Sequence, residues 1–346
     1  MARRSLAGTR LKRSQEIDRK AGNPKRQPGA AAMHIPDGFL SAPVAATTWI
    51  AAGAALAATL RAERRDPARI PSGVLGSLAA FVFAAQMINL PVAPGTSGHL
   101  VGATLAAMLV GPCRALIIMA VVLAIQALLF QDGGFTAYGA NLLDMGLAGS
   151  FVGFGAVFLS TRLLRDLRGP VVGAVLGAFT ATLSGAVLTS LWLALSGLYP
   201  LRGILSLMLV THTAIGVLEA ALTGAIVVTL LRWRPDLVAG PGGAAGLRRP
   251  AAVAVGVLGV ALVVAAFLAP FASPLPDGLE RTALDLGFSA RANPILPAPL
   301  EKSALFSGPL APWAPILAGL IGTLLVALVA WRAARGLSKA SDVPHR

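Results

Sequence analysis

A methionine and a histidine stand side by side at Met33-His34. If Met33 carries a free α-amine, that amine, the amide nitrogen of His34 and the imidazole Nδ1 of His34 can bind one ion through two adjacent chelate rings. The three nitrogens then share a plane, and a fourth nitrogen would complete a square. Ni²⁺ and Cu²⁺ suit this geometry, Co²⁺ can adopt it, and the oxygen-preferring ions Mg²⁺ and Ca²⁺ do not fit it. Pro36 has no N–H, so the chelate cannot extend further along the backbone.

The fourth nitrogen has few possible sources, because the chain holds only four histidines. His99 follows Pro94-Gly95-Thr96-Ser97-Gly98, a stretch whose proline and glycines exclude a regular helix. Non-helical backbone at membrane depth persists only where it is buried in protein or lines a cavity. We therefore expect His99 to supply the fourth nitrogen. The alternative is structural: His99 would cap a helix and His34 would lie in a loop.

A further histidine, His212, lies seven residues before Glu219 in a long apolar segment, which places both on one face of a helix. An ionisable residue inside a membrane indicates function by default. A structural hydrogen bond explains this pair equally well. We keep His212 and Glu219, together with Asp37, as residues that support the metal ligands or couple binding to transport. His345, in the polar tail, has no expected role.

Two aspartates, Asp132 and Asp144, could help to attract cations near the fourth and fifth apolar spans. Gly133-Gly134 beside Asp132 indicates a simple turn, however. Cys113 is the only cysteine, so an intramolecular disulfide and a cysteine-based zinc or iron–sulfur site are excluded.

The composition is that of a membrane protein, with 55% hydrophobic and 13% charged residues. We predict an all-α polytopic membrane protein with about nine transmembrane helices. The spans are expected at 42–60, 71–89, 99–112, 114–130, 142–161, 170–197, 204–231, 251–270 and 314–331. Most approach the roughly 20 residues that cross a bilayer. The third is too short to cross upright unless its start is buried in protein.

Lysine and arginine divide unevenly between the two sides of this layout. The connections on one side and the carboxyl-terminal tail hold sixteen, and the connections on the other side hold four. Cytoplasmic loops are the richer in these residues. We therefore expect a cytoplasmic carboxyl terminus, with Met33 outside.

Residues 1–32 disagree with this placement, because they carry nine Lys or Arg and no apolar run. We expect a disordered basic extension that results from a start codon assigned too early, so that translation begins at Met33. The alternatives are a cytoplasmic tail, which requires one span fewer, and processing after Ala32. About half of the net charge of +14 comes from this segment, so the charge gives no reason to expect nucleic-acid binding.

The remaining chain divides into two units. We expect a seven-span unit at 33–235, a cytoplasmic linker rich in glycine and arginine at 236–250, and a two-span unit at 251–346. The outer loop of the second unit contains Pro276-Asp277-Gly278-Leu279-Glu280, a turn that leads into a short amphipathic helix ending near Phe288.

Sequence signatures of ATP hydrolysis and zinc proteolysis are missing. The chain has no G-x-x-x-x-G-K-[ST] phosphate-binding loop and no H-E-x-x-H motif. We expect no catalytic residues and no catalytic cofactor. If transport is energised, another polypeptide must hydrolyse the ATP.

The sequence resembles the CbiM/NikM family, the substrate-capture (S) components of energy-coupling factor transporters for cobalt and nickel. The resemblance covers about residues 33–235, and its motifs are Met33-His34-Ile35-Pro36-Asp37-Gly38, Pro94-Gly95-Thr96-Ser97-Gly98-His99, and His212 to Glu219 with Thr223. Residues 251–346 resemble the two-span CbiN/NikN partner in their Pro-Asp-Gly-Leu-Glu motif, here fused in frame.

The resemblance implies a seven-span bundle whose amino terminus enters an outward cavity and binds the metal as substrate. It implies that the ligands are Met33, His34 and His99. It further implies a separate transmembrane coupling (T) protein, two cytoplasmic ATPase subunits, and a bacterial or archaeal plasma membrane. Retention of residues 1–32 would remove the free amine that this ligand set requires.

Two other classes of function can be compared with metal capture. An intramembrane serine protease would pair Ser184 with His212, but Thr182 stands where a glycine is expected and the Met-His pair stays unexplained. An autonomous secondary carrier or channel would need inverted repeats or charge-lined paths that are not evident. The sequence cannot separate Co²⁺ from Ni²⁺. Planar geometry and the form of the second unit favour Ni²⁺ slightly.

Overall fold

The computed structural model describes residues 34–65, 70–164, 166–238, 247, 249–268, 271–296, 299–300 and 313–340. Met33, residues 1–32, most of the linker and His345 lie outside the described residues. The longer elements are α2 (Ala42–Arg65), α3 (Ser72–Gln86), β1 (Leu90–Ala93), β2 (Thr96–Gly98), α4 (Ala103–Val110), α5 (Pro112–Ile125), α7 (Gly149–Leu163), α8 (Arg168–Leu195), α9 (Leu201–Trp233), α10 (Pro250–Val263), α11 (Gly278–Asp285) and α12 (Ala314–Ala340). The short elements are η1 (Gln126–Phe130), α6 (Tyr138–Asn141), η2 (Leu142–Ala148), η3 (Pro235–Leu237), η5 (Val264–Leu268) and η7 (Ser289–Arg291).

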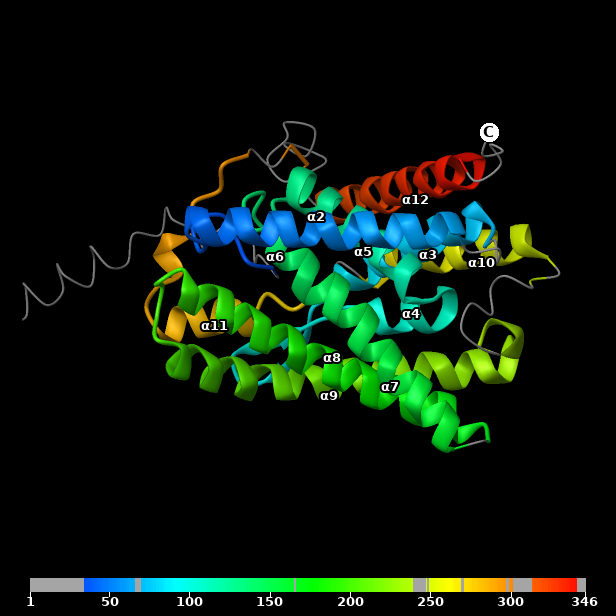
Figure 1. Ribbon diagram of the computed structural model, residues 1–346, viewed down its shortest axis with the longest axis horizontal. Coiled ribbons are helices and arrows are strands. Elements are labelled where there is room, and N and C mark those ends of the chain that lie inside the picture. Colours follow the sequence, from blue (N-terminus) through cyan, green and yellow to red (C-terminus); the bar gives the residue numbers. More distant parts are fainter. Residues whose placement is uncertain are drawn as a thin grey trace, which may run out of the picture. The chain divides into compact units, whose positions relative to one another are not determined.

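The chain is an all-α polytopic membrane protein (Figure 1). Each of the predicted spans corresponds to a helix or to a run of consecutive helices. Within the described residues, seven are long and apolar enough to cross a membrane. The second span is shorter than expected, because α3 has 15 residues.

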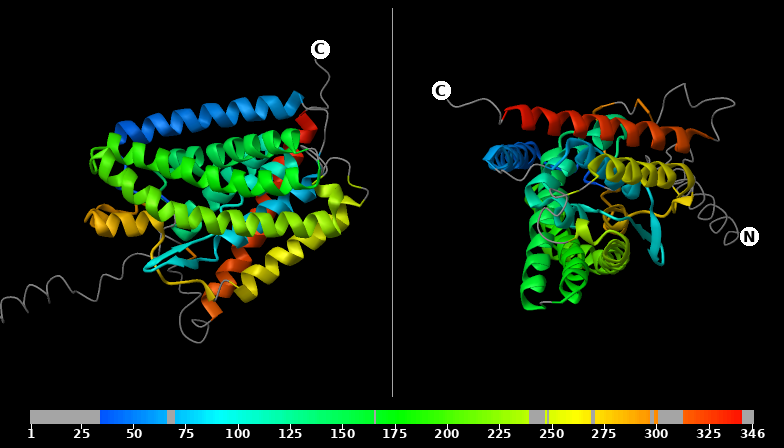
Figure 2. Two further views of the ribbon diagram at one scale, coloured as in Figure 1. Left: turned by 90° about the horizontal axis from the view of Figure 1, so that it is seen from below. Right: turned by 90° about the vertical axis from the view of Figure 1, so that its right-hand side faces the viewer.

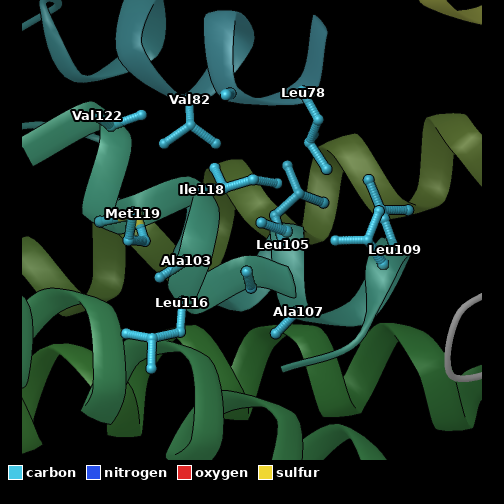
Figure 3. Close-up of a cluster of buried hydrophobic side chains, with 14 of the residues drawn as sticks. Leu78, Val82, Ala103, Leu105, Ala107, Leu109, Leu116, Ile118, Met119 and Val122 are labelled. Carbon is cyan, nitrogen blue, oxygen red and sulfur yellow. The ribbon is translucent and has the colours of Figure 1, made fainter. Parts of the chain in front are cut away.

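The shortest span, α4, has eight residues, and all of them are buried. Side chains of α3 and α5 surround it, as the cluster in Figure 3 shows. The labelled members are Leu78 and Val82 from α3, Ala103, Leu105, Ala107 and Leu109 from α4, and Leu116, Ile118, Met119 and Val122 from α5. Burial on all sides is what a helix too short to span a bilayer requires, since its end groups must be satisfied within the protein.

The stretch before His99 forms a small antiparallel hairpin of β1 and β2 instead of a helix. Gly95 occupies its turn at φ +74°, a backbone conformation that glycine adopts readily. A Cβ on Gly98 would lie 2.8 Å from Ile215 Cγ1, so the end of the hairpin packs closely on α9. The hairpin therefore delivers His99 to a position fixed between α9 and α4.

Small residues bring the long helices together, as their abundance in the sequence suggests. A Cβ on Gly173 of α8 would lie 2.6 Å from the Cα of Val157 on α7. A Cβ on Gly76 of α3 would lie 2.7 Å from the carbonyl oxygen of Ala327 on α12. Close backbone approach replaces the hydrophobic effect as the source of packing energy between helices in lipid.

The two long helices of the carboxyl-terminal unit, α10 and α12, both pack on α3 (Figure 2). This contact buries α3, because the first unit covers its other side. Between them, the outer segment forms α11, a helix with one apolar face, as expected for 278–288. α11 contacts α9 and β2, so it lies beside the hairpin that carries His99.

Candidate metal centre

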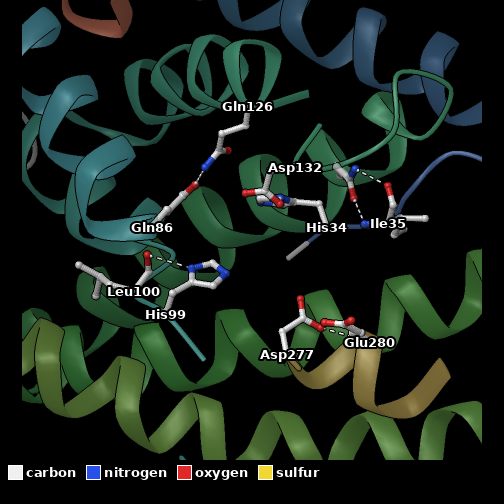
Figure 4. Close-up of polar contacts among 10 residues, drawn as sticks. His34, Ile35, Gln86, His99, Leu100, Gln126, Asp132, Asp277 and Glu280 are labelled. Atoms are coloured by element: carbon white, nitrogen blue, oxygen red, sulfur yellow. Dashed lines mark hydrogen bonds and ion pairs between the residues drawn. The ribbon is translucent and has the colours of Figure 1, made fainter. Parts of the chain in front are cut away.

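Three histidines, His34, His99 and His212, line one cavity of about 90 Å³. They come from the segment before α2, from the loop between β2 and α4, and from α9. The ring centroids of His34 and His99 are 6.2 Å apart and the ring planes are inclined by 50°. Figure 4 shows these two rings, with Asp277 of the carboxyl-terminal unit on the opposite side. The sequence predicted His34 and His99 as neighbours, and the structure brings them together.

The His34 ring is oriented by Asp132, 98 residues further along the chain. His34 Nδ1 lies 2.8 Å from Asp132 Oδ1. Burial disfavours the imidazolium, but the Asp132 carboxylate outweighs burial and raises the pKa of His34. Nε2 of His34 is buried and has no hydrogen-bond partner among the described residues. Asp132 therefore does more than its neighbouring glycines indicate, since it binds the ring of a predicted ligand.

The orientation of this ring bears on the chelate that the sequence predicts. That chelate uses Nδ1 of His34, the nitrogen that faces Asp132 here. A rotation of the ring by half a turn about the Cβ–Cγ bond would exchange its two edges, so that Nδ1 would point away from Asp132. Met33, which would supply the amine, lies outside the described residues, so the planar chelate stays a prediction.

His99 is 6% exposed, and its Nδ1 lies 3.3 Å from the carbonyl oxygen of Leu100. Burial, strengthened by the nearby His34, lowers the pKa of His99 to about 4. His99 is therefore neutral at physiological pH. Because its Nδ1 faces a carbonyl oxygen, the proton lies on Nδ1 and Nε2 keeps a lone pair for a metal.

Glu219 fixes the backbone just after His99. Its two carboxylate oxygens accept hydrogen bonds from Val101 N–H at 2.7 Å and Gly102 N–H at 3.1 Å. These amides begin α4, and a carboxylate satisfies unpaired N–H groups and the partial positive charge at such a helix start. Glu219 thus has a structural partner and supports the His99 loop from α9.

His212 occupies the same face of α9, as its spacing from Glu219 predicts, and reaches the cavity. Its Nδ1 lies 2.9 Å from the carbonyl oxygen of Met208, one turn earlier. The Nδ1 proton is held by this contact, so Nε2 keeps its lone pair. A Cβ on Gly278 would lie 2.6 Å from His212 Cε1, so the backbone of the carboxyl-terminal unit touches the ring.

The His34 segment is held by side chains of the loop that precedes α7. Asn141 accepts a hydrogen bond from Ile35 N–H at 2.9 Å and donates one to the Ile35 carbonyl at 3.1 Å. Gly134 N–H donates to the same carbonyl at 2.9 Å. Asp37 Oδ1 accepts from both the amide and the hydroxyl of Thr136, at 2.8 Å and 2.6 Å. Asp37 therefore fixes the segment without entering the cavity lining.

The carboxyl-terminal unit binds both histidine-bearing segments. The Ser97 amide donates to the Pro276 carbonyl at 2.9 Å, and the Ser97 hydroxyl donates to the Leu275 carbonyl at 2.6 Å. At the other end of the same loop, Asn293 N–H donates to the backbone oxygen of Asp37 at 2.8 Å. The loop between α10 and α12 thus bonds to both the His99 hairpin and the His34 segment.

An apolar cluster strengthens this contact. Leu279, Ala283 and Phe288 pack with Ile35 and Phe39, and the rings of Phe39 and Phe288 meet edge to face with centroids 5.3 Å apart. Residues that follow position 275 therefore help to bury two side chains just after His34.

Asp144 also lines the cavity, within the π-helical segment η2. Both of its oxygens accept hydrogen bonds, from Thr189 Oγ1 and from Trp192 Nε1, each at 2.8 Å. π-Helical turns are frequent at functional sites, where they redirect a side chain.

Side chains alone do not complete a metal site in the described part of the chain. No group of three or more His, Cys, Asp or Glu side chains there could hold an ion as placed. Sequence reasoning missed Asn141, because nothing local marks an asparagine that pairs with a segment more than 100 residues away. It placed Asp277 only in a turn, although this residue lines the cavity.

Comparison with known proteins identifies both units. Residues 34–237 match the CbiM family, described as a cobalt uptake substrate-specific transmembrane region. Residues 251–339 match the PDGLE domain.

One fused relative matches most of the chain, and a second relative matches about two thirds of it. A putative fused nickel transport protein NikMN of Archaeoglobus fulgidus is 34% identical over 301 residues, which cover 85% of this chain and 95% of the relative. A cobalt transport protein CbiM of Geobacter sulfurreducens is 37% identical over 247 residues, covering 65% and 68%.

Two solved structures resemble the first unit. A crystal structure of a transition metal transporter has 32% sequence identity and a TM-score of 0.50, and covers 58% of this chain and 93% of its own. A truncated transition metal transporter has 33% identity and a TM-score of 0.51, covering 58% and 99%. The chain therefore belongs to the CbiM family of membrane proteins for metal uptake, which are transport proteins and not enzymes.

Proposed function

We propose that this chain captures Ni²⁺ or Co²⁺ at the outer face of a bacterial or archaeal plasma membrane and delivers it to the cytoplasm as the S component of an energy-coupling factor transporter. The observation that carries the proposal is the convergence of His34 and His99 on one enclosed cavity, with ring centroids 6.2 Å apart. Two histidines from distant segments have no structural need to meet in a membrane protein, and ionisable groups there indicate function.

The proposed ligands are the amine of Met33, the amide and imidazole of His34, and the imidazole of His99. Four nitrogens in one plane suit Ni²⁺ and, less strongly, Co²⁺. The lean toward Ni²⁺ rests on this geometry and on the nickel transport names of fused relatives. In the chelate His34 presents Nδ1, so Asp132 must release this nitrogen while the ion loads.

Energy must come from outside this chain, which has no phosphate-binding loop. We assign it to a transmembrane coupling protein and two cytoplasmic ATPases. The uneven distribution of Lys and Arg supports Met33 outside and the carboxyl terminus in the cytoplasm. We assign the domains to residues 33–235, 236–250 and 251–346, and the family matches at 34–237 and 251–339 support this division.

The second unit has an accessory role in this proposal. Its outer loop bonds to Ser97 and Asp37, next to the two ligand histidines, and so it closes the cavity. We assign to it the loading and occlusion of the ion.

Uptake by cells that express the chain with and without its coupling protein and ATPases tests the proposal. Accumulation of ⁶³Ni or ⁵⁷Co should require all of the partners. Full uptake by the chain alone would contradict the proposal and favour an autonomous carrier or channel.

A further inference from the structure

The cavity contains a second set of metal-binding atoms beside the proposed ligands. Three carboxylates line it, from Asp144, Glu219 and Asp277, and none of the described residues that line it is a Lys or Arg. Such a cavity concentrates cations. The three carboxylates differ, however, in what they already bind.

Asp144 and Glu219 have both oxygens engaged. The partners are the Thr189 hydroxyl and the Trp192 indole for Asp144, and two backbone amides for Glu219. Asp277 uses only Oδ1, which accepts the Glu280 N–H at 2.7 Å and caps the start of α11. Among the described residues, Asp277 Oδ2 has no hydrogen bond. Of these three carboxylates, Asp277 is therefore the one with an oxygen available to bind a metal ion.

A histidine that touches the residue after Asp277 is suited to the same purpose. Gly278, which follows Asp277, abuts the His212 ring, with a would-be Cβ 2.6 Å from Cε1 and 3.0 Å from Nδ1. The Met208 carbonyl holds the Nδ1 proton of His212, so Nε2 carries the free lone pair. A histidine whose Nδ1 bonds a carbonyl or carboxylate while Nε2 stays free has the arrangement common to metal ligands.

His212 is also more exposed than the other two histidines, since His34 is 2% and His99 is 6% exposed and His212 is only half-buried. Asp277 belongs to the outer loop, which covers the cavity. Asp277 is itself only 4% exposed. Because it belongs to the loop that covers the cavity, and because His212 is the most exposed of the three rings, we place these two residues on the entry path of the ion.

We propose that His212 and Asp277 form a loading position, where a divalent transition-metal ion is held by one imidazole nitrogen and one carboxylate oxygen before it passes to His99 and His34. This inference rests on the proposed function and adds a step to it. One nitrogen and one oxygen bind weakly and accept Co²⁺, Ni²⁺ and Zn²⁺ alike. Selection then occurs at the planar nitrogen set, which does not suit tetrahedral Zn²⁺.

A loading ligand has a distinct kinetic signature. It lowers the free-energy barrier to both entry and exit of the ion. Its loss therefore slows association and dissociation equally and leaves the equilibrium affinity unchanged. A final ligand or a purely structural residue would instead change the affinity. The two roles are therefore separable by measuring rates and affinity on the same samples.

The test is stopped-flow binding of Ni²⁺ to the full chain, purified as cells produce it, with His212→Gln and Asp277→Asn variants. Each variant should load about tenfold more slowly, in line with the effect of cation-focusing groups on association rates. The dissociation constant should be that of the wild type. Asp277→Glu keeps the carboxylate and should restore most of the rate.

Asp285→Asn is the matched control, because it removes the same charge from the same helix at an exposed ion pair with Arg281. It should load at the wild-type rate. Wild-type loading rates in both test variants, or a weakened affinity in folded Asp277→Asn protein, would overturn the loading position. If the wild-type protein bound neither Ni²⁺ nor Co²⁺, the proposed function itself would fail, and the two failures are thus distinguishable.

Discussion

The two histidines of the proposed site are held by different kinds of structure. His34 lies in a segment without regular structure, and side chains of a distant loop bind its ring and the backbone after it. His99 precedes α4, a buried helix whose first amides are bound by Glu219. One half of the site is thus an irregular segment held by distant residues, and the other half is part of the core.

This difference separates two tasks that a capture site must perform. A segment held by a few hydrogen bonds can leave its place when an ion enters or departs. A residue at the start of a buried, capped helix keeps its position. We expect the His34 half to move during loading while the His99 half stays fixed, and the following variants test each half in turn.

The largest expected effect comes from removing either imidazole. His34→Ala and His99→Ala should each abolish high-affinity binding of Ni²⁺ and Co²⁺, because each removes a nitrogen from a four-nitrogen site. In wild-type protein, ion at a hundredfold excess over its dissociation constant should stabilise the fold by about 2.7 kcal/mol. Thermal unfolding with and without Ni²⁺ should show no such gain in either variant, while His345→Ala should behave as wild type. Unchanged metal retention by folded His99→Ala protein would remove this residue from the site.

Loss of the second unit should affect both halves at once, since its outer loop bonds to Ser97 and to Asp37. Deletion of residues 251–346 should strongly reduce uptake of ⁶³Ni in cells that contain the partner proteins. Cutting the chain between residues 240 and 248 and expressing both pieces should restore uptake, because the interface lies elsewhere. Full uptake after the deletion would show that the second unit is dispensable.

A change confined to the His34 half is Asn141→Leu. It removes the bond to Ile35 N–H and one of two bonds to the Ile35 carbonyl, and leaving a buried group unpaired costs about 1–3 kcal/mol. If the segment must dock for binding, Ni²⁺ affinity should fall about tenfold or more. Asn141→Asp keeps the acceptor for Ile35 N–H, so its Ni²⁺ affinity should lie between those of the wild type and Asn141→Leu. Calorimetric titration of the three proteins measures this order, and equal affinities would mean that docking does not require the clamp.

The smallest expected effect on binding comes from the His99 half. Glu219→Gln keeps the shape of the cap but removes the charge at the start of α4, which should cost about 1–2 kcal/mol of stability. Nickel affinity should change little, because Glu219 is not a ligand. Chemical denaturation and metal titration of the same sample separate the two effects. Lost affinity at unchanged stability would instead make Glu219 a functional partner of the ion.

The sequence predicts the membrane fold well, because apolar spans follow from composition alone. The shortness of α4 predicted its burial, and all eight of its residues are buried. The proline and glycines before His99 excluded a helix, and a hairpin stands there.

The partners of the metal segment could not be predicted. Asp132 stands beside two glycines and resembles any turn, yet it binds a ring 98 residues away. Asn141 has no motif at all, and Asp277 belongs to a different unit. These residues act through tertiary contacts, which depend on how the helices pack, and local patterns carry no information about such pairs.

The amine of Met33 is the most distinctive element of the proposed site, and the most direct measurement concerns it. Nickel affinity should be compared between a protein that starts at Met33 and a protein forced to start at Met1, with Met33→Ala to prevent internal initiation. The short form should bind one Ni²⁺ per chain, with a weak yellow absorption and no paramagnetism if the ion is planar. The long form should lose this affinity, because residue 33 then offers a peptide nitrogen in place of an amine. Equal affinity in the two forms would show that the terminal amine is not a ligand.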